Sequence, residues 1–353
     1  MSGCMTSLKT STPKVPRSIR AVVVPKRRTI RIGYVALMDA APLLAAEALG
    51  YFERDGVPVT LSRQLGWGSI REQAIYGEID AAHAPGGLLF SILCEERGGR
   101  PRQIATDLCL NLQGNAITLS RRLWEKGVRD IEGLRLMIRS ESPRKPVFAV
   151  VSPYSSHIIL LRQWLKSGGI NPDSDVRIAV LPPPLVGEHM REGLIDGFCA
   201  GEPWNSEAVM EGDGWVVVTS ATLAPLHPEK VFLASGWLMQ TPEYAALRAA
   251  IVRACRWCDG AENRDDLVAI LRERCFPKVS ADALGNALGR VFQTGVESLA
   301  MKQPLLSFYR NDANAATAQK AAWFFDGLSE AGTIASTPEL RRRALQAFRA
   351  PNQ

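Results

Sequence analysis

The chain has 353 residues, of which 46% are hydrophobic and 22% charged, a composition typical of soluble globular proteins. This length favours two domains over a single core, and no apolar run is long enough to suggest a membrane span or a membrane partner. The net charge of +6 does not indicate direct nucleic-acid binding, because residues 1–31 carry eight of the basic side chains and the remainder holds 34 basic against 36 acidic residues.

Residues 1–28 form a basic arm rich in Ser, Thr, Pro and Arg, which we expect to be disordered. Its uninterrupted apolar run, residues 21–24, is shorter than the core of about 7 to 15 residues that a secretory signal needs. Arg27 and Arg28 superficially resemble a twin-arginine signal, but Asp39 interrupts the apolar run that follows. We therefore predict a cytoplasmic protein.

From residue 29 onward, alternating strand and helix patterns predict an α/β fold with mainly parallel sheets. Asp39 is a candidate N-cap for the helix that starts near Pro42. Strands are expected at residues 29–37, 57–64, 103–110, 134–139, 147–151, 176–181 and 233–239. Helices are expected at residues 70–76, 88–97 and 158–166, and through most of residues 242–348.

Two segments of the chain are near copies of each other. Residues 77–87 read GEIDAAHAPGG and residues 193–204 read GLIDGFCAGEPW. Each predicts a polar turn, a short buried strand and a loop that opens a helix. Helix N-termini at the carboxyl ends of strands offer unpaired N–H groups to ligands. The repetition therefore predicts two similar lobes with a ligand cleft between them.

The predicted organisation has a hinge formed by two crossings between the lobes. Residues 215–219 are expected to return the chain to the first lobe. The predicted divisions are a disordered arm at 1–28, lobe 1 at 29–114 and 215–353 with the C-terminal helices, and lobe 2 at 115–214. A hinge of this kind permits closure on a ligand.

The motifs of common catalytic and cofactor sites are missing from the sequence. The four histidines are dispersed without the spacing of paired metal ligands, and neither a phosphate-binding glycine loop nor a nucleophile elbow is present. We therefore predict a binding protein rather than an enzyme, with no catalytic residue, no metal and no cofactor.

Several residues are candidates for ligand contacts. His157, beside the hydroxyls of Ser155 and Ser156, is expected in the first turn of a helix, where these groups converge on an anion or else cap and pack the helix. Lys230 lies in a loop, where a lysine is usually solvated. Trp67 stands between two glycines, and Gln113-Gly114 either aims an amide at a ligand or forms a simple turn.

The sequence resembles the nitrate and bicarbonate solute-binding proteins of ABC transporters over about residues 30–325. The segments that carry the resemblance are residues 32–43 (IGYVALMDAAPL), 66–71 (GWGSIR), 111–114 (NLQG), 182–184 (PPP), 198–204 (FCAGEPW), 227–230 (HPEK) and 257–263 (WCDGAEN). The resemblance implies a two-lobed periplasmic-binding-protein type II fold. It also implies that Trp67, Gln113, His157 and Lys230 hold the anion. We predict Gly114, Ser156 and Gly201 as further ligand contacts.

Among members of this family the chain looks most like the cytoplasmic nitrate/nitrite sensor that sequesters an RNA-binding antiterminator of nitrate assimilation genes. The partners implied are nitrate or nitrite and that antiterminator. Two alternatives remain. One is the nitrate-binding or bicarbonate-binding component of an ABC transporter, and the other is an enzyme similar to the thiamine-pyrimidine synthases that share the fold.

Overall fold

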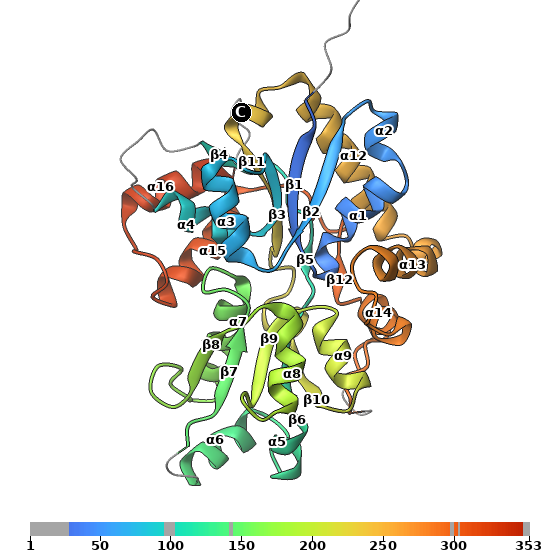
Figure 1. Cartoon of the computed structure of the whole chain (residues 1–353). Coiled ribbons are helices and arrows are strands. Elements are labelled where there is room, and N and C mark those ends of the chain that lie inside the picture. The colour runs from blue at the N-terminus through green and yellow to red at the C-terminus, as the bar shows by residue number, and fades with distance from the viewer. Residues whose placement is uncertain (1–27, 95–102, 141–143, 297–299, 303, 349–353) are drawn as a thin grey trace, which may run out of the picture.

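The computed structural model describes residues 28–94, 103–140, 144–296, 300–302 and 304–348, and apart from Arg28 the predicted basic arm lies outside them. Within these ranges the chain forms two lobes, each built on a five-stranded sheet, and the lobes lie one above the other in Figure 1. The predicted two-lobed α/β architecture is confirmed. No helix of the described residues is long and apolar enough to cross a membrane.

Lobe 1 holds a sheet with the strand order β2-β1-β3-β11-β4, in which β1 is parallel to β2 and β3, and β11 is antiparallel to β3. Its strands are β1 (Ile30–Val35), β2 (Val59–Gln64), β3 (Ala81–Pro85), β4 (Ile104–Ala105) and β11 (Lys230–Ser235). Its helices are α1 (Ala41–Ala48), α2 (Tyr51–Arg54), α3 (Trp67–Tyr76), α4 (Gly86–Leu93), α11 (Gly236–Met239) and α12 (Pro242–Cys258).

Lobe 2 holds the second sheet, with the strand order β10-β6-β9-β7-β8. Its strands are β6 (Asn115–Ser120), β7 (Val147–Val150), β8 (Arg177–Val180), β9 (Gly197–Gly201) and β10 (Gly214–Thr219). Its helices are α5 (Arg121–Glu125), α6 (Ile131–Ser140), α7 (Ser156–Ser167), α8 (Val186–Arg191) and α9 (Trp204–Met210). The short strand β5 (Leu112–Gln113) leads into this lobe, and α10 (Ser220–Leu223) leads out of it.

The two similar segments have the structure that the sequence predicts. The first supplies the buried strand β3 and the start of α4, and the second supplies the buried strand β9 and, after Pro203, α9. Asp80 accepts hydrogen bonds from the backbone and guanidinium of Arg31, and Asp196 accepts one from the backbone of Val147. Asp80 and Asp196 therefore hold in place the backbone that directly precedes β3 and β9.

Two expectations about lobe 2 are wrong. Residues 134–139 belong to α6 rather than to a strand, because Asp130 accepts a hydrogen bond from Gly133 N and begins a helix whose buried residue is Leu134. Residues 215–219 do not return the chain to lobe 1. They lie in β10, which pairs antiparallel with β6, so the chain leaves lobe 2 only after Thr219.

The C-terminal helices contact both lobes, whereas the sequence analysis assigned them to lobe 1. The helix α14 (Ala281–Leu288) packs on α9, and Asn286 donates a hydrogen bond to Ser206 of that helix. The carbonyl of Thr294 accepts from Val216 N at the edge of β10. The remaining elements are α13 (Arg264–Arg274), β12 (Leu306–Ser307), α15 (Ala318–Glu330), which contacts α4 and α7, and α16 (Pro338–Ala347).

Candidate anion-binding site

A cluster of polar side chains lies buried where the two lobes meet. Each member is at most 3% exposed. Lobe 1 supplies residues from a short 3₁₀ helix at Met38–Ala40, from β3 and from β11, and lobe 2 supplies residues from β6 and the first turn of α7. The members of this interlobe cluster are Asp39, His83, Asn115, Ser156, His157, His227, Glu229 and Lys230.

Lys230 is the positive centre of the interlobe cluster. It is the first residue of β11, in register with Pro85 of β3, so it is fully buried rather than solvated in a loop. Its Nζ lies 2.7 Å from Asp39 Oδ2 and 2.5 Å from Glu229 Oε1. Burial disfavours the charged amine, but the attraction of the two carboxylates outweighs it and raises the pKa of Lys230.

Asp39 does not cap the helix, as the sequence analysis expected. The helix α1 starts at Ala41, and its N-cap position is Ala40, which makes no side-chain capping bond. The carboxylate of Asp39 instead accepts a hydrogen bond from His83 Nε2 at 2.6 Å and faces Lys230. Burial opposes its ionisation, but Lys230 and His83 hold the pKa of Asp39 well below its usual range.

Glu229 connects the lysine to lobe 2. Its Oε2 accepts hydrogen bonds from Asn115 Nδ2 at 2.6 Å and from the hydroxyl of Ser156. The Asn115 side chain continues the network, because its Oδ1 accepts from His157 Nε2 at 2.9 Å. The polar atoms of Asn115 and the hydroxyl of Ser156 are therefore already committed to partners inside the protein.

The ionised groups of the interlobe cluster do not balance. Lys230 carries a single positive charge, and Asp39 and Glu229 each carry a negative charge because the pKa of both carboxyls is lowered. Burial lowers the pKa of His157 to about 4 and lowers the pKa values of His83 and His227 as well. Near neutral pH the histidines are uncharged, and the cluster has one more negative than positive charge.

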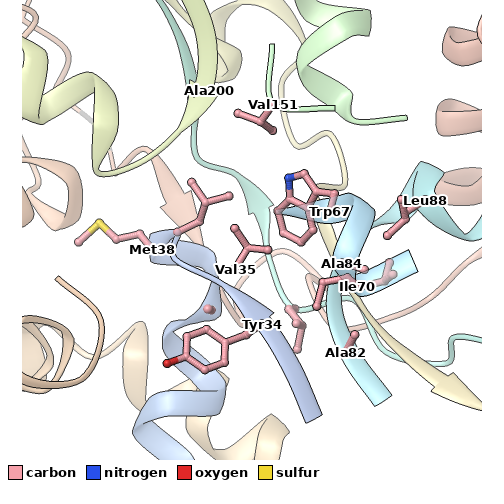
Figure 2. Packing of buried hydrophobic residues seen from close by; sticks show 14 of the residues in the cluster. Tyr34, Val35, Met38, Trp67, Ile70, Ala82, Ala84, Leu88, Val151 and Ala200 are labelled. Carbon is pink, nitrogen blue, oxygen red and sulfur yellow. The ribbon is translucent and has the colours of Figure 1, made fainter. Parts of the chain in front are cut away.

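Trp67 contributes an unpaired donor next to the interlobe cluster. The residue is 3% exposed, its ring lies 5.3 Å from that of His83, and Lys230 Nζ lies 5.5 Å from the ring centre. Its Nε1 is buried and has no hydrogen-bond partner among the described residues. Figure 2 shows this nitrogen directed away from Ile70 and toward the side on which Val151 of lobe 2 lies.

Three ring nitrogens in the cluster also lack partners within the described part of the chain, namely His83 Nδ1, His157 Nδ1 and His227 Nε2. The first belongs to lobe 1, the second to lobe 2 and the third to the segment that precedes β11. Together with Trp67 Nε1 they are polar atoms that the surrounding protein leaves unpaired, and buried polar atoms are normally paired. Such atoms from both lobes indicate a site for a small polar ligand.

The lobes are closed against each other around these residues. Met38 N donates to Glu202 O at 2.7 Å, and Trp204 Nε1 donates to Ala36 O at 3.2 Å. Gly201 lies at the same contact, because a Cβ there would be 3.3 Å from Asn115 Oδ1 and 3.6 Å from Asp39 Oδ2. A side chain at Gly201 would therefore enter the interlobe cluster.

The other predicted contacts lie at the edge of the site. Gly114 has a φ of 99°, which favours glycine, and its carbonyl accepts from Glu202 N. Gln113, with a φ of 59°, donates its backbone N–H to the carbonyl of His227 and lines a surface hollow beside Leu306 and Arg310. The structure thus brings together Trp67, Ser156, His157, Gly201 and Lys230, and their contact with a ligand stays a prediction.

Most of the network around Lys230 was not predicted from the sequence. Asp39 was expected in a different role, and His83, Asn115, His227 and Glu229 were not candidates. The available signal was their position within the quoted motifs, since His83 lies in the first repeated segment and Glu229 directly precedes Lys230.

The fold and the buried interlobe cluster define a two-lobed solute-binding protein with the periplasmic-binding-protein type II architecture. The chain belongs to the NMT1-like family, whose model matches residues 24–272. The crystal structure of the periplasmic nitrate-binding protein NrtA from Synechocystis PCC 6803 matches with a TM-score of 0.83 and 26% identity, over 90% of this chain and 85% of that one.

Curated relatives agree with this assignment. The chain is 32% identical over 288 residues to the nitrate/nitrite binding protein NrtA of Nostoc sp., covering 78% of this chain and 64% of that protein. It is 34% identical over 250 residues to the bicarbonate transport ATP-binding protein CmpC of Synechococcus elongatus, covering 70% of this chain and 38% of that protein. The chain thus spans less than half of the length of this ATP-binding relative. The resemblance to nitrate and bicarbonate solute-binding proteins is confirmed.

Proposed function

We propose that this protein binds nitrate or nitrite in the interlobe cluster and acts as a cytoplasmic sensor of that anion. The observation that carries the proposal is the fully buried Lys230 beside the unpaired N–H of Trp67. Nitrate is a planar monoanion whose oxygens only accept hydrogen bonds, so its site needs directed donors and a fixed positive charge. Trp67 and Lys230 supply these from lobe 1, and His157 faces them from lobe 2.

The matched relatives narrow the ligand class. NrtA is named as a nitrate/nitrite binding protein and CmpC as a bicarbonate transport protein. Bicarbonate differs from nitrate in carrying an O–H donor, which needs an acceptor in the site. The carboxylate oxygens of Asp39 and Glu229 already accept from protein donors, so the O–H of bicarbonate would compete with these donors for the same oxygens.

An enzymatic role has less support. Cys199 lies in β9, within the second of the two similar segments, and burial raises the pKa of its thiol well above the usual value. The thiol is therefore protonated and a poor nucleophile. The curated relatives reported above are binding and transport proteins.

The proposed regulatory step is linkage between the anion and a protein partner. An anion that contacts both lobes stabilises the closed arrangement, and a partner that prefers one arrangement is then bound or released. We propose that the partner is an RNA-binding antiterminator of nitrate assimilation genes, which is released when the anion binds. The second candidate function, supported by the match to NrtA, is the binding component of an ABC transporter.

Two measurements test this proposal. Calorimetric titration with nitrate, nitrite and bicarbonate should give saturable binding of nitrate or nitrite and weaker binding of bicarbonate, whereas binding of none of them would refute the anion site. The protein should then be purified from its native host with and without nitrate. An RNA-binding protein retained only without nitrate supports the sensor, and transporter subunits in its place support the second candidate.

A further inference from the structure

The hydrogen bonds of His157 define which of its nitrogens carries the hydrogen. Asn115 Nδ2 lies 2.6 Å from Glu229 Oε2, which only accepts, so the amide of Asn115 directs its oxygen to His157. Since that oxygen also only accepts, His157 Nε2 is the donor across 2.9 Å. In the neutral ring the other nitrogen, Nδ1, then has a lone pair and no hydrogen.

A lone pair at His157 Nδ1 repels an anion whose oxygens only accept. It is nevertheless the polar atom that lobe 2 leaves unpaired in the cluster, because the side-chain atoms of Asn115 and Ser156 are committed. Closure on a ligand requires favourable contacts from both lobes. The Nδ1 atom provides such a contact only when it is protonated.

We propose that anion binding at the interlobe cluster takes up one proton from solvent, which forms an N–H bond at His157 Nδ1 and makes His157 a cationic donor to the anion. This inference rests on the proposed function and adds the protonation state of its site. The conjugate base of the buffer remains in solution, so charge and atoms balance. Nitrate is the anion of a strong acid and does not carry this proton itself.

Burial opposes a positive charge on His157, but a neighbouring carboxylate favours it. Glu229 Oε1 lies 3.6 Å from Nε2 and becomes an ion-pair partner of the protonated ring. Without this proton, a monoanion would enter a buried site where the two carboxylates of Asp39 and Glu229 face only Lys230. Protonation of His157 offsets the charge of the entering anion, so the cluster keeps its net charge of one negative, and burying an uncompensated charge is costly.

The other charged and titratable groups around His157 do not replace this role. His227 donates its Nδ1 hydrogen to Pro228 O and stacks on Trp323 of α15. Its Nε2 is also unpaired among the described residues, so His227 is included in the variant test. Of the elements packed on α7, β9 contributes the protonated thiol of Cys199 and α10 contributes no titratable residue. The helices α6 and α15 carry exposed carboxylates at the following positions: Glu132, Asp326 and Glu330.

His83 is the alternative proton acceptor and is treated as an outcome of the test. Its Nε2 donates to Asp39, so its Nδ1 also has a lone pair in the neutral ring. It differs from His157 because it belongs to lobe 1, which already supplies the Lys230 ammonium and the Trp67 N–H, whereas His157 belongs to lobe 2. The field of that ammonium group opposes a second positive charge on the His83 ring.

The test is calorimetric titration with nitrate at pH 7.5 in phosphate, imidazole and Tris buffers, which differ in their ionisation enthalpy. The slope of the observed enthalpy against the ionisation enthalpy of the buffer gives the number of protons taken up per nitrate bound. We expect about one proton, and the nitrate affinity should then fall about tenfold per pH unit above neutrality. Binding with a slope of zero overturns this inference and leaves the proposed function intact. Absence of binding in every buffer overturns both.

Matched variants then assign the proton. The His157→Gln variant keeps an amide donor that needs no proton, so proton uptake should disappear. The His83→Gln and His227→Gln variants should each retain it. His189→Gln, on α8 outside the interlobe cluster, is the control and should behave as the wild type. Uptake that persists in His157→Gln contradicts the assignment.

Discussion

Lys230 Nζ lies 2.7 Å from Asp39 Oδ2, and both groups are buried at the contact between the lobes. The two residues are far apart in the sequence, one before α1 and the other at the start of β11. The pair places a fixed positive charge at the junction of the lobes but partly neutralises it. Anion binding therefore depends on the balance between Lys230 and the carboxylates beside it.

The first prediction concerns Asp39. The Asp39→Asn change removes a negative charge from the site but keeps an oxygen that can accept from His83 Nε2. We expect nitrate to bind about tenfold more tightly, because a like charge near the anion is removed, and the anion-free protein to lose about 1 to 3 kcal/mol of stability. Calorimetry and urea denaturation measure these effects, and weaker nitrate binding by a folded variant would contradict the charge argument.

The second prediction concerns the indole N–H of Trp67. The Trp67→Phe change keeps an aromatic ring and removes a donor that has no partner in the described structure. A hydrogen bond to a charged group contributes about 1.5 to 3 kcal/mol, so the nitrate affinity should fall roughly tenfold to a hundredfold. The anion-free stability should change little. Trp237→Phe, at a tryptophan that is 46% exposed, is the control and should leave the affinity unchanged.

The third prediction concerns closure of the lobes. A Cβ on Gly87, in the first turn of α4, would lie 2.4 Å from the backbone oxygen of Tyr154 in lobe 2. Gly87→Ala should therefore hold the lobes apart and weaken nitrate binding by about tenfold or more, because the closed state is less populated. Small-angle scattering with saturating nitrate should show a larger radius of gyration than for wild type.

The control for this variant is Gly285→Ala on α14, where a Cβ would meet nothing within 4 Å. Its affinity and radius of gyration should equal those of the wild type. Closure of Gly87→Ala to the wild-type dimensions would show that this contact does not limit the lobes.

The fourth prediction is a loss of stability in mild acid. Burial lowers the pKa of His157 to about 4, below the usual value of 6.5, and lowers those of His83 and His227 too. Between these pH values the unfolded chain binds more protons than the folded one, so the free energy of unfolding decreases as the pH falls. His157 alone should cost about 2 kcal/mol between pH 7 and pH 5. Glu202 opposes this effect, because burial raises its pKa to about 7. Urea denaturation across this range should therefore compare the wild type with His157→Gln, in which Glu202 is unchanged. The unfolding free energy should fall more in the wild type, and equal changes in both proteins would contradict burial of a neutral His157.

Sequence patterns were sufficient where local chemistry decides the structure. The repeated segments at residues 77–87 and 193–204 predicted a buried strand followed by a helix, and both occur. Sequence patterns were insufficient where the structure of a segment depends on a partner that is distant in the sequence. The sequence of β10 indicates a strand, but its place in lobe 2 depends on its pairing with β6. Residues 134–139 have apolar positions that fit a strand and also fit the helix α6.

The site was predicted in part for the same reason. His157 was a candidate because it stands in the first turn of a predicted helix, and Trp67 because it stands between two glycines in a motif of the family. The role of Asp39 was misjudged because a carboxylate before a proline-containing helix start normally caps it, whereas here β3 and β11 bring His83 and Lys230 to it. A buried ion pair across long sequence separation leaves no local pattern.

The central claim is that the interlobe cluster binds the anion through Lys230. The decisive measurement is calorimetric titration with nitrate of the wild type and the double variant Lys230→Met/Asp39→Asn, which removes the lysine but keeps the net charge of the cluster. Lys166→Met is the control, because Lys166 pairs with Glu330 on the surface. We expect saturable nitrate binding by the wild type and by the Lys166→Met control, and no binding by the folded double variant. Equal binding by all three proteins would contradict the role of Lys230.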